Sequence, residues 1–148
     1  MNKSWYLLRY HYGQAERAIM NLEYLGVNCF SPRVKTPYSG KHKKAGKEGD
    51  HLFPPYVFVE FDPESIQYSS VQHTPGVCGF VRFGQTLKEV PVDVITVLLN
   101  PMLTEQPGQS PVLNSIFRCQ DKSLRTMMFL SLMEKVQNGE SLRLRTLN

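Results

Sequence analysis

The chain has 148 residues, of which 41% are hydrophobic and 20% charged, so it can form one domain with a sizeable core plus a small appendage, and global disorder is excluded. No apolar run approaches the roughly 18 residues of a membrane span, and the first residues lack the apolar stretch of a secretion signal, so we expect a cytoplasmic protein with no membrane partner. The net charge is +4, and residues 1–50 hold nine Lys and Arg residues against four acids, which favours nucleic acid as a partner, although solubility alone would explain the same asymmetry.

The first third of the chain predicts a strand, a helix and a second strand. Residues 5–10 are large side chains with strand propensity, and they end shortly before Gly13. Residues 14–25 repeat apolar side chains at helical spacing, and Gly26 suits the C-terminal cap. Residues 27–31 are a short strand that Pro32 closes.

A basic loop and a long strand follow. Residues 35–51 are polar, rich in glycine and basic, which predicts a loop or the tip of a hairpin. Residues 52–61 are predicted to be a strand, with two prolines near its start. Its alternation places Tyr56 and Phe58 on one side, and Val57 and Val59 on the other.

The next segment repeats the strand–helix–strand pattern. Asp62 is a plausible N-cap for a short helix that we expect to end at about Ser69. Residues 77–83 are predicted to be a strand and residues 91–99 a helix. The order of elements is the split βαβ pattern of ferredoxin-like domains, so we predict an α+β fold over residues 1–99, with an antiparallel sheet flanked by helices.

The remainder predicts a linker and a small tail. Residues 100–114 hold three prolines and no clear period, which is typical of a linker. Residues 115–148 are too few to bury a core of their own. Leucine and methionine favour a helix in this tail, although part of the pattern also fits the period of a strand. The expected apolar stripe consists of Leu124, Met127, Met128, Leu130, Leu132, Met133 and Val136.

No pattern in the sequence points to catalysis. The chain has no Gly-rich phosphate loop, no His-Glu-x-x-His and no Cys-x-x-Cys. Three widely spaced cysteines are neither a disulfide framework nor a zinc pattern, and small reduced hydrophobic residues are the simpler interpretation. We therefore expect no enzyme activity, no cofactor and no metal.

The aromatic strand has two interpretations. The periodicity of Tyr56 and Phe58 by itself favours a place in the core. Together with Phe53 and Pro54, however, these side chains could form an apolar patch for a helix of a partner protein.

Several motifs resemble, in order and spacing, the N-terminal domain of the NusG family, and within it most closely the specialised antiterminators of the RfaH kind. The resemblance covers residues 4–99. It is carried by Trp5-Tyr6-Leu7-Leu8, Gly13-Gln14 with Arg17-Ala18, Asn28-Cys29-Phe30-Ser31-Pro32, Leu52-Phe53-Pro54-Pro55-Tyr56-Val57-Phe58-Val59-Glu60-Phe61, Asp62-Pro63-Glu64, and Pro75-Gly76-Val77 with Phe80-Val81-Arg82-Phe83-Gly84.

The resemblance implies two contacts with RNA polymerase. A hydrophobic surface would bind the clamp helices of the β′ subunit, and its positions here are Leu7, Phe53, Pro54, Tyr56, Phe58 and Phe83. A tyrosine of the RfaH first strand is replaced by Arg9, which makes one edge less apolar. A second contact, with the gate loop of the β subunit, would use Gln67, Tyr68 and Ser69.

The resemblance also implies a nucleic-acid face that reads the non-template DNA strand. The matching positions are His11, Tyr12, Gln14, Arg17, Asn21 and Thr74. His11 and Tyr12 replace basic residues and Pro75 replaces an arginine, so the DNA element is not predicted to be the same one. Lys41, Lys43 and Lys44 in the basic loop would add salt-dependent attraction, unless the loop is only a solvated tip.

The C-terminal segment departs from the family pattern, because neither the opening strand nor the Gly-rich turn of a KOW barrel is visible. We predict a helix over residues 120–137 that packs on the aromatic patch or mediates a dimer, and little or no contact with the ribosome. The expected function is an elongation and antitermination factor. The alternatives are a generic nucleic-acid-binding domain and a truncated regulator that competes with a full-length factor.

Overall fold

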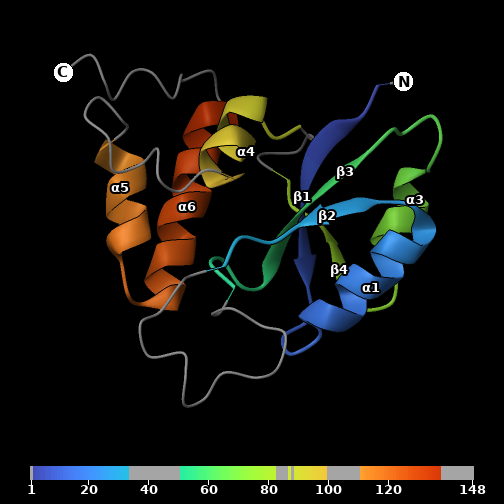
Figure 1. Ribbon diagram of the computed structural model, residues 1–148, viewed down its shortest axis with the longest axis horizontal. Helices are drawn as coiled ribbons and strands as arrows, with labels where there is room; N and C mark the ends of the chain where they lie inside the picture. Colours follow the sequence, from blue (N-terminus) through green and yellow to red (C-terminus); the bar gives the residue numbers. More distant parts are fainter. Residues whose placement is uncertain (1, 34–50, 83–86, 88, 100–110, 138–148) are drawn as a thin grey trace.

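The computed structural model describes residues 2–33, 51–82, 87, 89–99 and 111–137 (Figure 1). In chain order its elements are β1 (Ser4–Tyr10), α1 (Ala15–Leu25), β2 (Asn28–Phe30), β3 (Tyr56–Phe61), α3 (Tyr68–Gln72), β4 (Val77–Phe80), α4 (Val92–Leu99), α5 (Pro111–Arg118) and α6 (Lys122–Gln137). The four strands form one sheet in the order β2-β3-β1-β4, and each neighbouring pair is antiparallel. The predicted α+β fold and its split βαβ pattern are confirmed.

Helices α1 and α3 cover one face of the sheet (Figure 1). Helix α1 buries Ala15, Ala18 and Leu22 at helical spacing and ends at Gly26, whose φ of 103° is the left-handed conformation that glycine adopts without strain. These side chains pack on the even-numbered residues of β1 and the odd-numbered residues of β3, as alternation along a strand requires. The cluster contains Tyr6, Leu8, Tyr10, Val57, Val59 and Phe61.

Helices α4, α5 and α6 cover the opposite face (Figure 1). This second cluster joins Leu7 of β1 and Phe58 of β3, which are paired across the two strands, to buried side chains of all three helices. Its helical members are Val94, Ile95, Leu98, Ile116, Phe129 and Met133. Within the described residues, no helix is long and apolar enough to cross a membrane.

Three elements of the sheet domain have a boundary more than one residue from the prediction. Strand β3 begins at Tyr56 rather than at residue 52, because Pro54 and Pro55 lack N–H groups and the chain turns there, with the Tyr56 N–H donating to the Phe53 carbonyl at 2.8 Å. The helix predicted over residues 62–69 is instead α3, Tyr68–Gln72. Asp62 accepts the N–H of Glu64 at 3.0 Å, but this closes only a turn, since extended backbone at Gln67 (ψ 148°) precedes the helix. Strand β4 ends at Phe80 instead of residue 83.

The described part of the tail consists of two helices joined by residues 119–121. Helix α6 spans Lys122–Gln137 within the predicted range 120–137. Helix α5 begins at Pro111, so its first residues lie in the range that the prolines had predicted to be a linker. Proline is favourable at the start of a helix, where its missing N–H has no intrahelical partner.

Candidate functional site

We call Leu7, Phe53, Pro54, Tyr56 and Phe58 the β3 patch. The predicted alternation is confirmed, because Tyr56 and Phe58 face α4 and α6 whereas Val57 and Val59 face α1. Leu7, Phe53 and Phe58 are buried, and Tyr56 is half-buried. The patch is therefore part of the core in this arrangement. Phe83, also predicted to belong to it, lies outside the described residues.

Helix α6 covers the β3 patch through one aromatic side chain. The ring of Phe129 stacks on Phe53, with centroids 4.2 Å apart and planes 12° from parallel, and meets Phe58 edge-on at 5.7 Å. Phe129 is fully buried, as is Met133 one turn further along. Each such side chain contributes roughly 1.5–3 kcal/mol when it leaves water, so the apolar contact is the main term in the docking of the helix.

Two polar side chains of α6 fix its position on the turn before β3. The buried Arg125 donates from Nε to the Leu52 carbonyl at 2.8 Å, and from a terminal nitrogen to the Cys119 carbonyl at 3.0 Å. Thr126 donates to the Pro54 carbonyl at 3.3 Å. Because hydrogen bonds are directional, they specify one register of the helix, which apolar packing alone would not.

The buried face of α6 differs from the predicted stripe. Leu124 and Met127 are 50% and 66% exposed. Arg125 and Thr126 are buried instead, together with Phe129, which the predicted stripe omitted. The sequence signal for Phe129 was present, since Phe129 and Met133 are four residues apart. The burial of an arginine has no such signal, because it depends on carbonyl groups of a distant turn.

One edge of the β3 patch is charged, as predicted. Arg9 is exposed and pairs with Tyr56 across β1 and β3, so both side chains leave the same face of the sheet. The edge nearest the end of β1 is therefore less apolar than the centre at Phe58.

A groove of about 550 Å³ lies at the N-terminal end of α1. It is lined by four of the predicted nucleic-acid residues, His11, Gln14, Arg17 and Thr74, together with Gln72, His73, Pro75, Gly76, Val77 and Cys78. The Arg17 guanidinium donates to the Gln14 side-chain oxygen at 3.0 Å, so the two act as one unit on the first turn of the helix. His73, which follows α3, and Cys78 of β4 were not predicted to belong to this site. Cys78 reaches His11 because β1 pairs with β4.

The floor of the groove depends on Gly76. Its φ is 94°, and a Cβ placed there would lie 2.9 Å from the backbone nitrogen of Ala18. The turn before β4 therefore lies directly against α1. Asn21 holds the same turn, by donating to the Pro75 carbonyl at 3.4 Å.

Not every predicted nucleic-acid residue offers a free side chain to the groove. Tyr12 is 73% exposed and does not line the groove. Thr74 is buried, and its hydroxyl donates to the Ser70 carbonyl at 2.9 Å, so it ends α3 rather than offering a free donor. Lys41, Lys43 and Lys44 lie outside the described residues.

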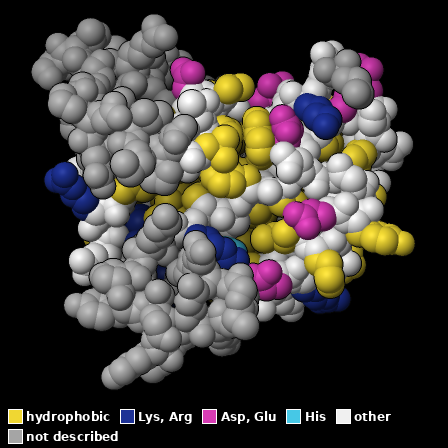
Figure 2. Space-filling view, in the orientation of Figure 1, with side chains coloured by type: hydrophobic (Ala, Val, Ile, Leu, Met, Phe, Trp, Pro, Cys, Tyr) yellow, Lys and Arg dark blue, Asp and Glu magenta, His cyan; other side chains and the backbone are white. Residues whose placement is uncertain are grey.

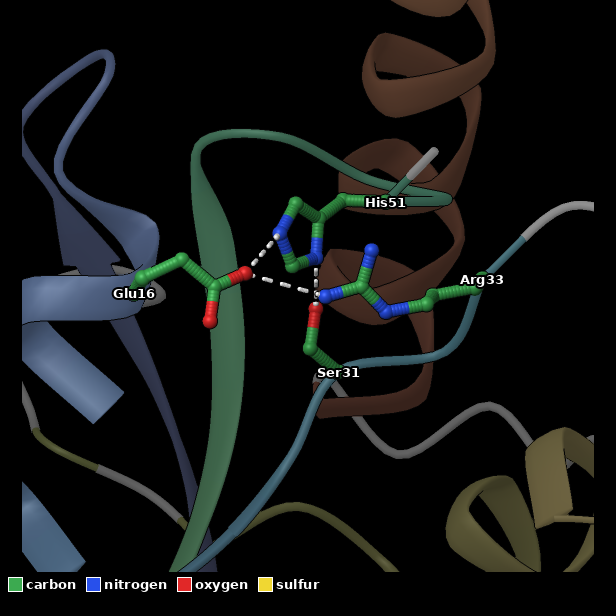
Figure 3. A network of polar contacts seen from close by, with 4 residues as sticks. All are labelled: Glu16, Ser31, Arg33 and His51. Atoms are coloured by element: carbon green, nitrogen blue, oxygen red, sulfur yellow. Dashed lines mark hydrogen bonds and ion pairs between the residues drawn. The ribbon is translucent and has the colours of Figure 1, made fainter. Parts of the chain in front are cut away.

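A polar network connects Arg33 and His51, the described residues on either side of segment 34–50, to α1 (Figure 3). Arg33 forms an ion pair with Glu16 at 3.1 Å, and the ring of His51 lies 3.9 Å from the same carboxylate. Ser31 also bonds to the His51 ring at 2.7 Å. Arg33 and His51 thus both lie near Glu16, the residue that precedes Arg17 in the sequence.

On the side facing the viewer in Figure 2, hydrophobic and acidic side chains are interspersed over the sheet half of the molecule, and its described residues form no continuous basic patch there.

The predicted gate-loop segment lies at the start of α3. Gln67 and Ser69 are exposed, but the Tyr68 ring packs edge-on against Tyr6, Phe61 and Phe80. Its hydroxyl is 2.8 Å from that of Tyr6. Tyr68 therefore anchors the helix to the sheet, although it remains 40% exposed beside Gln67 and Ser69.

Across the described part of the chain, no group of three or more His, Cys, Asp or Glu side chains is arranged to hold a metal ion. The site consists of an apolar patch under a helix and a polar groove.

Comparison with known proteins identifies the family. Residues 3–99 match the sequence model of NusG, described as transcription termination factor nusG. The chain belongs to the NusG family. Members of this family are transcription factors. The resemblance to the RfaH group within it stays a prediction.

A solved structure concerned with domain interaction in Thermotoga maritima NusG is also similar to this chain. The two are 26% identical, with a TM-score of 0.48, and the match covers 74% of this chain. The chain spans 63% of the length of that NusG chain.

Proposed function

We propose that this NusG-family chain binds RNA polymerase through the β3 patch and the unpaired non-template DNA strand through the Arg17 groove. By holding the polymerase clamp in its closed, elongating state, it suppresses pausing and termination. A binding protein can do this without catalysis when its affinity for one state of the polymerase exceeds its affinity for the other. The observation that carries the proposal is the contact between α6 and the β3 patch.

The β3 patch has the composition of a surface for a partner helix. Phe53, Tyr56 and Phe58 present aromatic area, and the occupant in this structure is itself a helix. A helix that inserts Phe129 between Phe53 and Phe58 demonstrates the shape that the patch accepts. The clamp helices of polymerase are proposed to take the same place, so that α6 competes with them.

A set of full-length variants tests this competition. Phe129→Ala weakens the docking of α6, so it should raise the affinity for core polymerase; the gain equals the rise in the fraction of chains with an open patch. Met127→Ala, on the exposed side of the same helix, is the matched control and should bind as the unmodified chain does.

The second half of the test removes the patch. In the Phe129→Ala background, Tyr56→Ala should reduce polymerase binding, whereas Tyr24→Ala, which alters a side chain 94% exposed on α1, should not. Equal binding by the two double variants would reject the clamp assignment.

The groove has features suited to a single strand. Arg17 and Gln14 offer donors for phosphate or a base edge, and Tyr12 and His11 are exposed rings beside them. The ion pair with Glu16 holds Arg33, a further cation, against the first turn of α1. This convergence supports a strand that passes along the first turn of α1. Gln67 and Ser69 are proposed as the contact with the polymerase gate loop.

Arg17→Ala should weaken binding of a non-template oligonucleotide and reduce the salt slope of the affinity by about one charge. Arg118→Ala, which removes an exposed arginine at the end of α5, is the control and should leave both quantities unchanged. Binding that is equal for duplex and single strand, or insensitive to salt, contradicts the site. Transcription across a terminator, with and without a full-length NusG, then separates an antiterminator from a competitor.

A further inference from the structure

Cys78 lies beside a histidine in the groove. It is exposed on β4, and its Sγ is 3.2 Å from Nδ1 of His11, which follows the end of β1. The register of the two strands brings them together, because Tyr10 pairs with Val77, the residue before Cys78. A thiol within hydrogen-bond distance of an imidazole nitrogen is the arrangement that activates cysteine as a nucleophile.

The other two cysteines have different surroundings. Burial, with a smaller contribution from Glu23, raises the pKa of Cys29 to about 12, so this thiol stays protonated at neutral pH. Cys119 is half-buried, and its Sγ contacts the Asp121 carbonyl at 3.6 Å. Neither contact involves a base, so the three thiols of this chain should differ widely in reactivity.

We propose that Cys78 is a thiol–disulfide exchange site with His11 as its base, which takes small disulfides that carry carboxylate groups. The groove at Cys78 has a volume of about 550 Å³ and is open to solvent, so a small molecule can reach the sulfur. Arg17 lines the same groove and attracts a carboxylate. Arg17 would thus bind the carboxylate of the same molecule whose disulfide reacts with Cys78.

The exchange balances without any further reagent. In the tautomer with its proton on Nε2, His11 accepts the Cys78 proton at Nδ1. The thiolate attacks one sulfur of the disulfide, forming a new S–S bond as the old one breaks. The departing thiolate takes the proton from His11. Cys78 is oxidised, and the released half of the disulfide is reduced.

The consequence depends on the proposed function of the groove. A mixed disulfide at Cys78 places carboxylates where the phosphates of the strand would lie, beside Arg17. The modified chain should therefore bind the single strand weakly until a thiol reductant restores it. Polymerase binding should persist, because the β3 patch lies in the cluster under α4, α5 and α6, whereas β4 and α1 beside the groove belong to the cluster on the opposite face of the sheet.

The rate of reaction of the full chain with dithiobis-nitrobenzoate tests the site itself. One thiol should react in a fast phase that Cys78→Ser removes. His11→Ala should slow this phase roughly tenfold at neutral pH, and less at alkaline pH where free thiols ionise without help. Tyr24→Ala is the control and should keep the rate, since Tyr24 is 94% exposed on α1 and does not line the groove. A fast phase that persists in Cys78→Ser, or equal pH profiles for His11→Ala and the unmodified chain, would overturn the proposal.

A second measurement separates this inference from the proposed function. After treatment with glutathione disulfide, with the adduct located by peptide mass spectrometry, the affinity for a single-stranded oligonucleotide should fall roughly tenfold, about the effect of one lost charge contact. Treated Cys78→Ser should bind as untreated Cys78→Ser does. If the adduct forms and affinity is unchanged, the link to the groove is wrong. If the untreated chain binds no oligonucleotide, the proposed nucleic-acid function fails, while the exchange site is judged by its rate.

Discussion

The helices on the two faces of the sheet are attached to it in different ways. Helix α1 directly follows β1 along the chain, and its contact is almost wholly apolar, with Ala18 and Leu22 fully buried. Helix α6 is distant in sequence, and adds the buried hydrogen bonds of Arg125 and Thr126 to its apolar contact. The position of α1 on the sheet is fixed by its short connection to β1 and by apolar packing. The α6 contact joins segments 73 residues apart, so its geometry has to be fixed by directional bonds.

This difference predicts which face opens first. Leu22→Ala should lower the free energy of unfolding of the sheet domain by about 2–5 kcal/mol, because the cavity lies where helix and sheet form together. Phe129→Ala removes an equally buried ring, but the loss should fall on the docking of α6 alone. Hydrogen exchange should show faster exchange in residues 122–137 of Phe129→Ala while β1 and β3 stay protected. Equal loss of protection in the sheet for both variants would show that the two faces form one cooperative unit.

A smaller effect distinguishes the polar anchors from the apolar contact. Arg125→Ala removes the donors to the Leu52 and Cys119 carbonyls, which should weaken the docking of α6 by about 1–3 kcal/mol. Arg125→Lys should recover only part of this loss, because an ammonium group cannot reproduce the guanidinium fork. Lys122→Ala, on an exposed residue of α6, is the control. Exchange rates in α6 that are the same for Arg125→Ala and Lys122→Ala would show that the helix has no need of the anchor.

The smallest effect concerns the face covered by α1, where Tyr10 is buried and its hydroxyl has no hydrogen-bond partner among the described residues. Burial raises the pKa of Tyr10 from 10.0 to about 12. The folded state thus favours the neutral phenol, so its contribution to stability is complete below pH 10 and is lost as the pH rises from 10 to about 12. Tyr10→Phe should be neutral or stabilising by up to about 1 kcal/mol at pH 7.

The measurement is urea denaturation of Tyr10→Phe and the unmodified chain across that pH range. The difference between them should grow in favour of Tyr10→Phe above pH 10. Cys29 titrates in an overlapping range in both chains, since burial raises its pKa from 9.0 to about 12, so only the difference between the chains reports on Tyr10. Parallel curves would show that this hydroxyl remains hydrated in the folded state.

The sequence predicted the sheet domain well because its signals are local. The repeat of Ala15, Ala18 and Leu22 determines a helix and its buried face, and the alternation of β3 determines which side chains share a face. It failed where a distant segment decides the outcome. The start of α3 at Tyr68 depends on packing against Tyr6 and Phe80, which overrides the cap signal of Asp62.

In the candidate sites, too, the sequence predicted what depends on local patterns and missed what depends on distant segments. The resemblance identified Phe53 and Phe58. Only the structure revealed that Phe129 stacks on Phe53 and that the buried Arg125 donates to the Leu52 carbonyl beside it. In the groove, Gln14 and Arg17 could be paired from helical spacing. The approach of Cys78 to His11 could not, because it depends on strand register, and that register shifts between Arg9 and Tyr10.

The polar network of Glu16, Arg33 and His51 has a consequence for protein engineering. Arg33 and His51 form an antiparallel bridge, and the Leu52 N–H donates to the Pro32 carbonyl at 2.7 Å. The residues on either side of segment 34–50 are therefore already held together by the rest of the fold. Closing a loop costs only about 0.6 kcal/mol more for each doubling of its length. Segment 34–50 can therefore be exchanged as a cassette, with its sequence and length redesigned for another nucleic acid while the scaffold beneath it is retained.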